Sequence, residues 1–136
     1  MNLDKVYEKI QNNGIKVLHF GLENVKSVSV EVNNRYGIFI NHKEIKDSDE
    51  EFLVATHEYG HCVTGSTHPP YSSIDIISRH EHRADRKAII DFLPIDRIKS
   101  AIKDGCRYAH EFSEYLEVPE PFIIKAFQHY VAMELI

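Results

Sequence analysis

Two histidines four positions apart carry the clearest chemical signal in this sequence. Residues 57–61 read H-E-Y-G-H, and at about 100° per helical residue His61 lies within about 40° of His57, one turn further along. Both imidazoles can therefore reach one cation. Glu58 is offset by one position, which keeps its carboxylate out of the ligand set but close enough to accept a proton from a water that the metal activates. The segment predicts a metal site with a general base.

Composition allows this motif to be weighed against coincidence. The chain holds nine histidines among 136 residues, which gives about 0.6 chance pairs at this spacing and about 0.06 when a glutamate must follow the first histidine. Gly60 adds a separate sign, because a glycine inside a helix costs on the order of 1 kcal/mol relative to alanine. We therefore expect a close approach of some other group at Gly60.

A catalytic zinc takes three protein ligands and keeps a fourth position for water, so the sequence must supply one more donor. The loop after the first motif offers His68, and the next helical segment offers Glu81 and Asp85, one turn apart. Glu81 falls on an apolar stripe, where a carboxylate needs a partner. We predict that Glu81 is the third ligand and that Asp85 holds a ligating imidazole by its other nitrogen. The stripe consists of Ile77, Ala84, Ala88 and Phe92.

Glu81 also has a structural interpretation. Ser78 and Glu81 have capping-box spacing, in which Glu81 would only bond the start of its own helix. His80 and His82 are rival ligands, but each points about 100° away from Glu81 on a helix, so they are expected at the rim of the site or facing a substrate.

A reaction at this site also needs a donor for a developing oxyanion, and the sequence leaves it open. Three residues are candidates: His68 and Tyr71 in the loop, and Tyr36 near the predicted hairpin. Cys62 follows His61 directly and so points away from it, which favours a buried thiol over a ligand.

The elements that must position these residues can be read from periodicity and turn signals. A helix is predicted over 3–10, strands over 15–20, 27–32 and 36–41 with a turn at Asn33-Asn34, and a helix opened by a capping box at Ser48 and Glu51 and ended by Gly65. Further helices are predicted over 77–92, 94–105, 108–116 and from about 122 to the end. This order predicts an α+β fold in which a small antiparallel three-stranded sheet packs with a mainly helical core.

Length and charge restrict the classes of function. We interpret residues 1–136 as one domain, with a helix and sheet over 1–45, the two metal-site helices over 46–93 and C-terminal helices over 94–136. The net charge of −5 disfavours direct binding of nucleic acid, and no apolar run approaches the ~18 residues of a membrane span. Two cysteines fit a reducing compartment, so a cytoplasmic protein is expected.

Several of these segments together resemble the ImmA/IrrE family of metallopeptidases, over nearly the whole chain. The matching segments are Y-G-I-F-I-N at 36–41, H-E-Y-G-H at 57–61, E-H-R-A-D-R-K-A at 81–88, Leu-Pro at 93–94 and Y-L-E-V-P at 115–119. The resemblance implies one Zn²⁺ per chain on His57, His61 and Glu81, with Glu58 as the catalytic base. Tyr59 and Lys87 depart from residues more usual in the family, at positions that affect packing.

The resemblance also implies a substrate, namely a helix-turn-helix repressor of a phage or mobile element whose cleavage relieves repression. Two other hypotheses remain open. The protein can be a metal-containing antagonist that binds the regulator without cutting it, or residues 108–116 and 122–130 can form a helix-turn-helix that contacts DNA. The second of these is poor in base-reading side chains, with Lys125 and Gln128 as exceptions.

Overall fold

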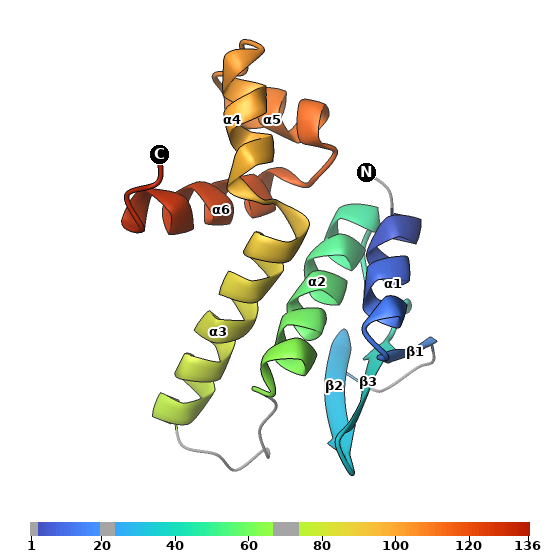
Figure 1. The fold of residues 1–136 in the computed structure, drawn as a ribbon. Helices are drawn as coiled ribbons and strands as arrows, with labels where there is room; N and C mark the ends of the chain where they lie inside the picture. Colours follow the sequence, from blue (N-terminus) through green and yellow to red (C-terminus); the bar gives the residue numbers. More distant parts are fainter. Residues whose placement is uncertain (1–2, 20–23, 67–73) are drawn as a thin grey trace.

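The computed structural model describes residues 3–19, 24–66 and 74–136. One helix and three strands come first, and helices follow: α1 (Leu3–Asn12), β1 (Lys16–His19), β2 (Ser27–Val32), β3 (Arg35–Ile40), α2 (Ser48–Thr64), α3 (Ile74–Phe92), α4 (Ile95–Lys103), α5 (Ala109–Leu116) and α6 (Glu120–Ala132). The strands are segregated from the later helices, so the predicted α+β class is confirmed. Helix α2 lies between α3 on one side and the sheet on the other (Figure 1).

The sheet has the order β1-β3-β2, with the most apolar strand in the centre. Strands β2 and β3 form the predicted antiparallel hairpin, and Asn33 and Asn34 both take positive φ values, as a tight hairpin turn requires. The prediction of a wholly antiparallel sheet is wrong, because β1 pairs with β3 in parallel. The chain reverses direction twice between β1 and β3, so a β1 that joins the free edge of β3 must run the same way.

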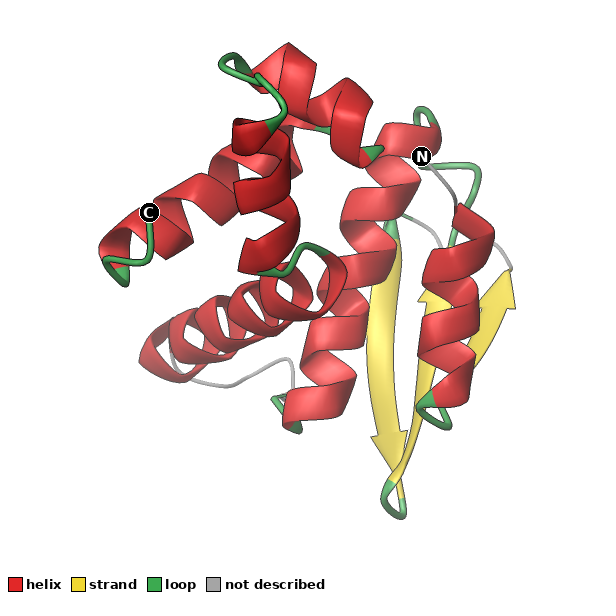
Figure 2. Cartoon of the chain, turned by 45° about the horizontal axis from the view of Figure 1, so that its top comes forward, coloured by secondary structure: helices red, strands yellow, loops and turns green. Residues whose placement is uncertain are grey.

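Helices α1 and α2 cover one face of this sheet (Figure 2). Ile38 and Ile40 of β3 point to that face and are completely buried. The register sets Ser29 opposite Ile38 and Ser27 opposite Ile40, so the serines of β2 share the covered face. The valines at 28, 30 and 32 alternate with them as the sequence predicts, but they face away from the helices, and Val32 is 65% exposed.

The two helices of the predicted site start earlier than their sequence signals suggest. Asp47 caps α2, with its side chain accepting from the Glu50 N–H at 2.9 Å, so the prediction of a capping box at Ser48 and Glu51 is wrong by one residue. Helix α3 begins at Ile74, which puts Ser78 in its second turn. The capping-box interpretation of Glu81 is therefore also wrong, because Glu81 lies well inside the helix.

The C-terminal helices complete the core beside α3. Helix α4 follows Pro94, as predicted, and α6 packs against both α5 and α3. One face of α6 is buried, through Phe122, Ile123 and Ala126. None of the helices in the described segments is both long and apolar enough to cross a membrane.

Candidate metal centre

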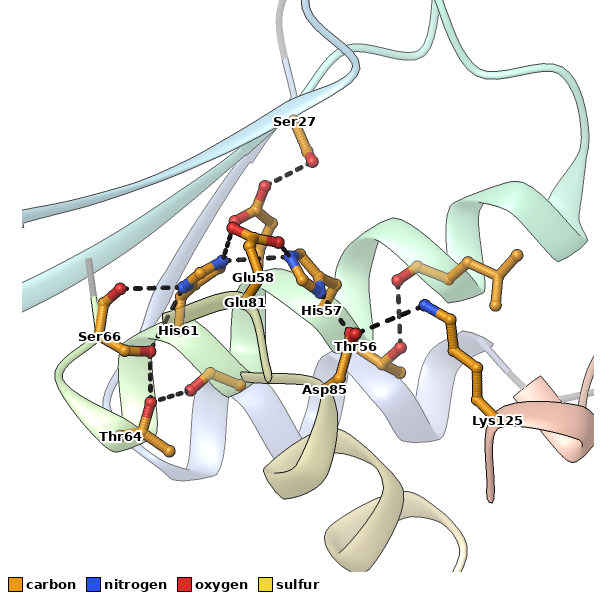
Figure 3. Close-up of polar contacts among 12 residues, drawn as sticks. Ser27, Thr56, His57, Glu58, His61, Thr64, Ser66, Glu81, Asp85 and Lys125 are labelled. Atoms are coloured by element: carbon orange, nitrogen blue, oxygen red, sulfur yellow. Dashed lines mark hydrogen bonds and ion pairs between the residues drawn. The ribbon is translucent and has the colours of Figure 1, made fainter. Parts of the chain in front are cut away.

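Side-chain nitrogen and oxygen atoms of three residues converge between α2 and α3 (Figure 3). Nε2 of His61 lies 3.1 Å from Nε2 of His57 and 2.9 Å from Oε1 of Glu81, and Nε2 of His57 lies 2.6 Å from Oε2 of Glu81. A tetrahedral zinc with bonds near 2.05 Å sets its ligand atoms about 3.3 Å apart. The three residues would thus hold an ion after opening by less than about 1 Å.

The outer nitrogens of both imidazoles show why this cluster suits a cation. Nδ1 of His57 lies 2.8 Å from Oδ1 of Asp85, and Nδ1 of His61 lies 3.1 Å from the carbonyl oxygen of Ser66. Both of these partners accept hydrogen bonds, so each neutral ring carries its proton on Nδ1 and turns the lone pair of Nε2 inward. The two Nε2 lone pairs and the Glu81 carboxylate then repel one another where they meet. Only a proton or a metal ion between them can remove this repulsion. The donor set, two imidazoles and one carboxylate, fits zinc.

Neighbouring groups raise the pKa of His57 and lower the pKa of Asp85, which strengthens the hydrogen bond between them. Burial acts to lower the pKa of His57, but the hydrogen bond with Asp85 and the charges of Glu81, Asp85 and Glu58 raise it above the usual 6.5. Burial likewise acts to raise the pKa of Asp85, yet His57 and Lys125 hold it below 3.8. Nζ of Lys125, on α6, is 3.6 Å from Oδ2 of Asp85. Asp85 therefore stays ionised and can orient the imidazole.

Glu58 is turned from the helix toward the sheet. It is only 8% exposed, and its Oε2 accepts a hydrogen bond from Oγ of Ser27, the first residue of β2, at 2.6 Å. The carboxylate borders a cavity of about 200 Å³ that it shares with the three converging residues. Seven residues line this cavity: Ser27, Val28, Ser29, His57, Glu58, His61 and Glu81. A proton acceptor and a potential metal site thus face the same space.

The spacing of α2 and α3 depends on Gly60. A Cβ added there would lie 2.1 Å from the carbonyl oxygen of Ala84 on α3, so the expected close approach is confirmed. The contact lets Glu81, almost one turn before Ala84, reach both histidines. Gly65 ends α2 in the left-handed conformation with φ +63°, and the chain then brings the carbonyl of Ser66 back to His61.

The remaining candidates from the sequence lie elsewhere or outside the described residues. His68 and Tyr71 belong to the undescribed segment 67–73. His82 is exposed on α3 and borders the groove between α3 and α6, not the cavity at the converging atoms. Tyr36 packs against the core near Gly65. Burial raises the pKa of Cys62 to about 12, with the charge of Glu58 adding to the effect, in agreement with a structural thiol.

Sequence reasoning missed three partners of the site: Ser27, Ser66 and Lys125. Each comes from a separate element and touches a residue that the motif had already identified. Ser66 follows a predicted helix stop, which could have suggested it. The alternation of serine with valine in β2 could have suggested Ser27, had the polar side been recognised as the covered one.

Comparisons with protein-family models, with curated proteins and with solved structures found no match to this chain.

Proposed function

We propose that this protein is a zinc-dependent endopeptidase. One observation carries the proposal: a buried carboxylate, Glu58, borders the same cavity as a convergent set of two imidazoles and a carboxylate. A metal that only supported the fold would need no such base, and would be enclosed by four protein ligands. Here three ligands face a cavity, so one side is left for water and substrate.

The residues divide the work of hydrolysis. A zinc ion at the site would supply Lewis acidity to the scissile carbonyl and to the attacking water. Glu58 accepts the proton of that water and later passes it to the leaving amine. Ser27 occupies Oε2 of Glu58, which fixes the carboxylate and leaves Oε1 for the proton. Asp85 and the Ser66 carbonyl keep His57 and His61 in the tautomers that bind metal.

The neighbouring strand supports a polypeptide as the substrate. In the described sheet β2 is an edge strand, and its first residues, Ser27 to Ser29, border the cavity. An extended segment can pair with the outer edge of such a strand through its main chain, whatever its sequence. Such pairing would draw the segment past Glu58 and the metal ligands.

We further propose a helix-turn-helix repressor as the physiological substrate, on the basis of the resemblance to the ImmA/IrrE family. The DNA-binding alternative gains no support from α5 and α6, because one face of α6 is buried and Lys125, one of its two base-reading candidates, faces Asp85. A peptidase of this kind acts in the cytoplasm, where such a repressor is found, with no direct contact to nucleic acid.

The test is co-expression with a repressor encoded beside this protein. Wild-type protein should yield two defined repressor fragments, whereas Glu58→Gln, which keeps its zinc but cannot accept the proton, should yield none. Glu114→Gln, at an exposed site on α5, is the matched control and should cut normally. Full cutting by Glu58→Gln overturns the mechanism. Stable binding of an intact repressor, without fragments, favours the antagonist instead.

A further inference from the structure

A second cavity lies against the metal centre, on the side of His57 away from Glu58. Its volume is about 270 Å³, and it shares Ser27 and His57 with the metal cavity while Asp85 and Lys125 form another part of its wall. Because the two cavities share these residues, a polypeptide bound at the metal centre would have a neighbouring side chain at the entrance of the second cavity.

The walls of this second cavity are largely apolar and come from three helices. Leu53 and Val54 lie one turn before His57 on α2, Ala88 and Ile89 lie one turn after Asp85 on α3, and the start of α6 closes the far side. Six apolar residues contribute: Leu53, Val54, Ala88, Ile89, Pro121 and Phe122. Removing an apolar group from water into such a space is favourable, whereas a charged group would lose its hydration.

The charged groups of the wall already balance each other. Asp85 lies 2.8 Å from His57 and 3.6 Å from Lys125, so its carboxylate is engaged on both oxygens. The stem of Lys125 adds methylene surface at the rim, while the side chain as a whole stays half exposed. This wall therefore offers no unbalanced charge that would select a charged side chain.

We propose that this cavity is the specificity pocket of the enzyme and binds a large apolar side chain, such as leucine or phenylalanine, from a residue next to the scissile bond. This inference rests on the proposed peptidase function. A volume of 270 Å³ is just below the range of about 300–1,000 Å³ typical of whole small-molecule sites, which suits one side chain. Val54, three residues before His57 and on the same helix face, belongs to the wall of the pocket, so its size should limit the volume left for a bound side chain.

Binding of small hydroxamates to the zinc-loaded full chain tests the pocket without requiring turnover. Two pairs are compared by calorimetry: leucine with alanine hydroxamate, and isobutyl- with methyl-malonyl hydroxamate, which place the side chain on opposite sides of the zinc-binding group. In one pair the isobutyl compound should bind at least about tenfold tighter than the methyl compound. Ratios near one in both pairs overturn the pocket.

Variants at Val54 assign the preference to this cavity. Val54→Phe fills it and should bring the isobutyl-to-methyl ratio close to one, while Val54→Ala deepens it and should favour a benzyl compound over the isobutyl one. Val131→Phe, on an exposed part of α6, is the matched control and should leave the ratio unchanged. Zinc content and circular dichroism establish that each variant is folded. An unchanged ratio in both folded Val54 variants also overturns the proposal.

A cleavage assay distinguishes a failure of the pocket proposal from a failure of the peptidase proposal. A peptide mixture with all residues represented is incubated with the protein, and cleavage sites are identified by mass spectrometry. Cleavage that depends on Glu58 but shows no apolar preference beside the cut bond removes the pocket and keeps the peptidase. Selective hydroxamate binding with no cleavage of any peptide keeps the pocket and removes the peptidase.

Discussion

Strands β2 and β3 turn the same side of the sheet toward the helices, yet they present opposite chemistry there. On β3 that side carries Ile38 and Ile40, which are completely buried, and on β2 it carries Ser27 and Ser29. The isoleucines pack into the core, whereas the serines border the cavity of the metal centre. A polar stripe on a covered face of a sheet therefore marks the border between the packed core and the candidate metal centre.

A polar substitution on the inner face of β3 should have the largest effect on stability. Ile38→Ser would leave a cavity and bury a hydroxyl, so we expect the free energy of unfolding to fall by about 3–5 kcal/mol. Urea titration followed by circular dichroism measures the change. Val32→Ser, on the outward side of β2, should change it by less than about 0.5 kcal/mol. A loss below about 1 kcal/mol for Ile38→Ser would show that the inner face of β3 is not part of the core.

At the metal centre, unlike in the core, stability should depend on zinc. Zinc at about 1,000 times its dissociation constant should stabilise the wild-type protein by about 4 kcal/mol, because it binds the folded chain. Glu81→Ala should lose most of this gain, while Glu114→Ala should keep it. Thermal melts with and without chelator provide the measurement. An equal zinc-dependent gain in Glu81→Ala would remove Glu81 from the ligand set.

Replacing Asp85 should weaken zinc binding less than replacing a metal ligand would. Asp85→Ala removes the acceptor that orients His57, so zinc affinity should fall roughly 10- to 100-fold with the fold intact. Competition with a chromophoric chelator measures this. Asp96→Ala, at an exposed position in α4, is the control. Unchanged zinc affinity in Asp85→Ala would make the contact with His57 incidental to metal binding.

The metal-free and zinc-loaded proteins should respond to pH with opposite signs. The pKa of His57 is raised in the folded, metal-free protein, so its contribution to stability is complete below the unfolded value near 6.5 and is lost as the pH rises through the folded value. Zinc competes with that proton, so zinc affinity should increase over the same interval. Unfolding at pH 5.5 and 8.5, with and without chelator, measures both trends. Parallel trends would contradict the assignment of His57 as a ligand.

Substitution of the serines on the inner face of β2 should have the smallest effect. Ser27→Ala removes the hydrogen bond to Glu58 and should lower kcat about tenfold, while the free energy of unfolding changes by about 1 kcal/mol. Ser29→Ala, next on the same side of β2, should affect kcat less, since no contact to Glu58 is seen for it in the described structure. Equal effects of the two changes would mean that Ser27 does not position the base.

Sequence alone predicted the parts of the fold that depend on neighbouring residues. The hairpin turn at Asn33 and Asn34 and the end of α2 at Gly65 come from local conformational preferences, and helix periodicity placed His57, His61 and Glu81 where the structure brings them together. The direction of β1 could not be predicted, because it depends on which edge of the hairpin is free.

Two partners of the site, Ser27 and Lys125, were harder to predict because they are distant in sequence from the residues that they contact. Ser27 is 31 residues from Glu58, and Lys125 reaches Asp85 from a different helix. The alternation around Ser27 marks a polar side of the strand but not its partner, and nothing in the local pattern around Lys125 signals a contact with Asp85. The side of β2 that faces the helices was also not evident, since alternation fixes two faces without saying which is covered.

The turn after α2 limits where this chain can change its length. Surface turns usually tolerate insertions, because nothing else depends on their register. Here the Ser66 N–H donates to the His61 carbonyl at 2.9 Å, and the Ser66 carbonyl accepts from the ring of the same histidine. One extra residue between Gly65 and Ser66 would move that carbonyl and release the imidazole. In this loop, we therefore expect insertions to be tolerated only after Ser66.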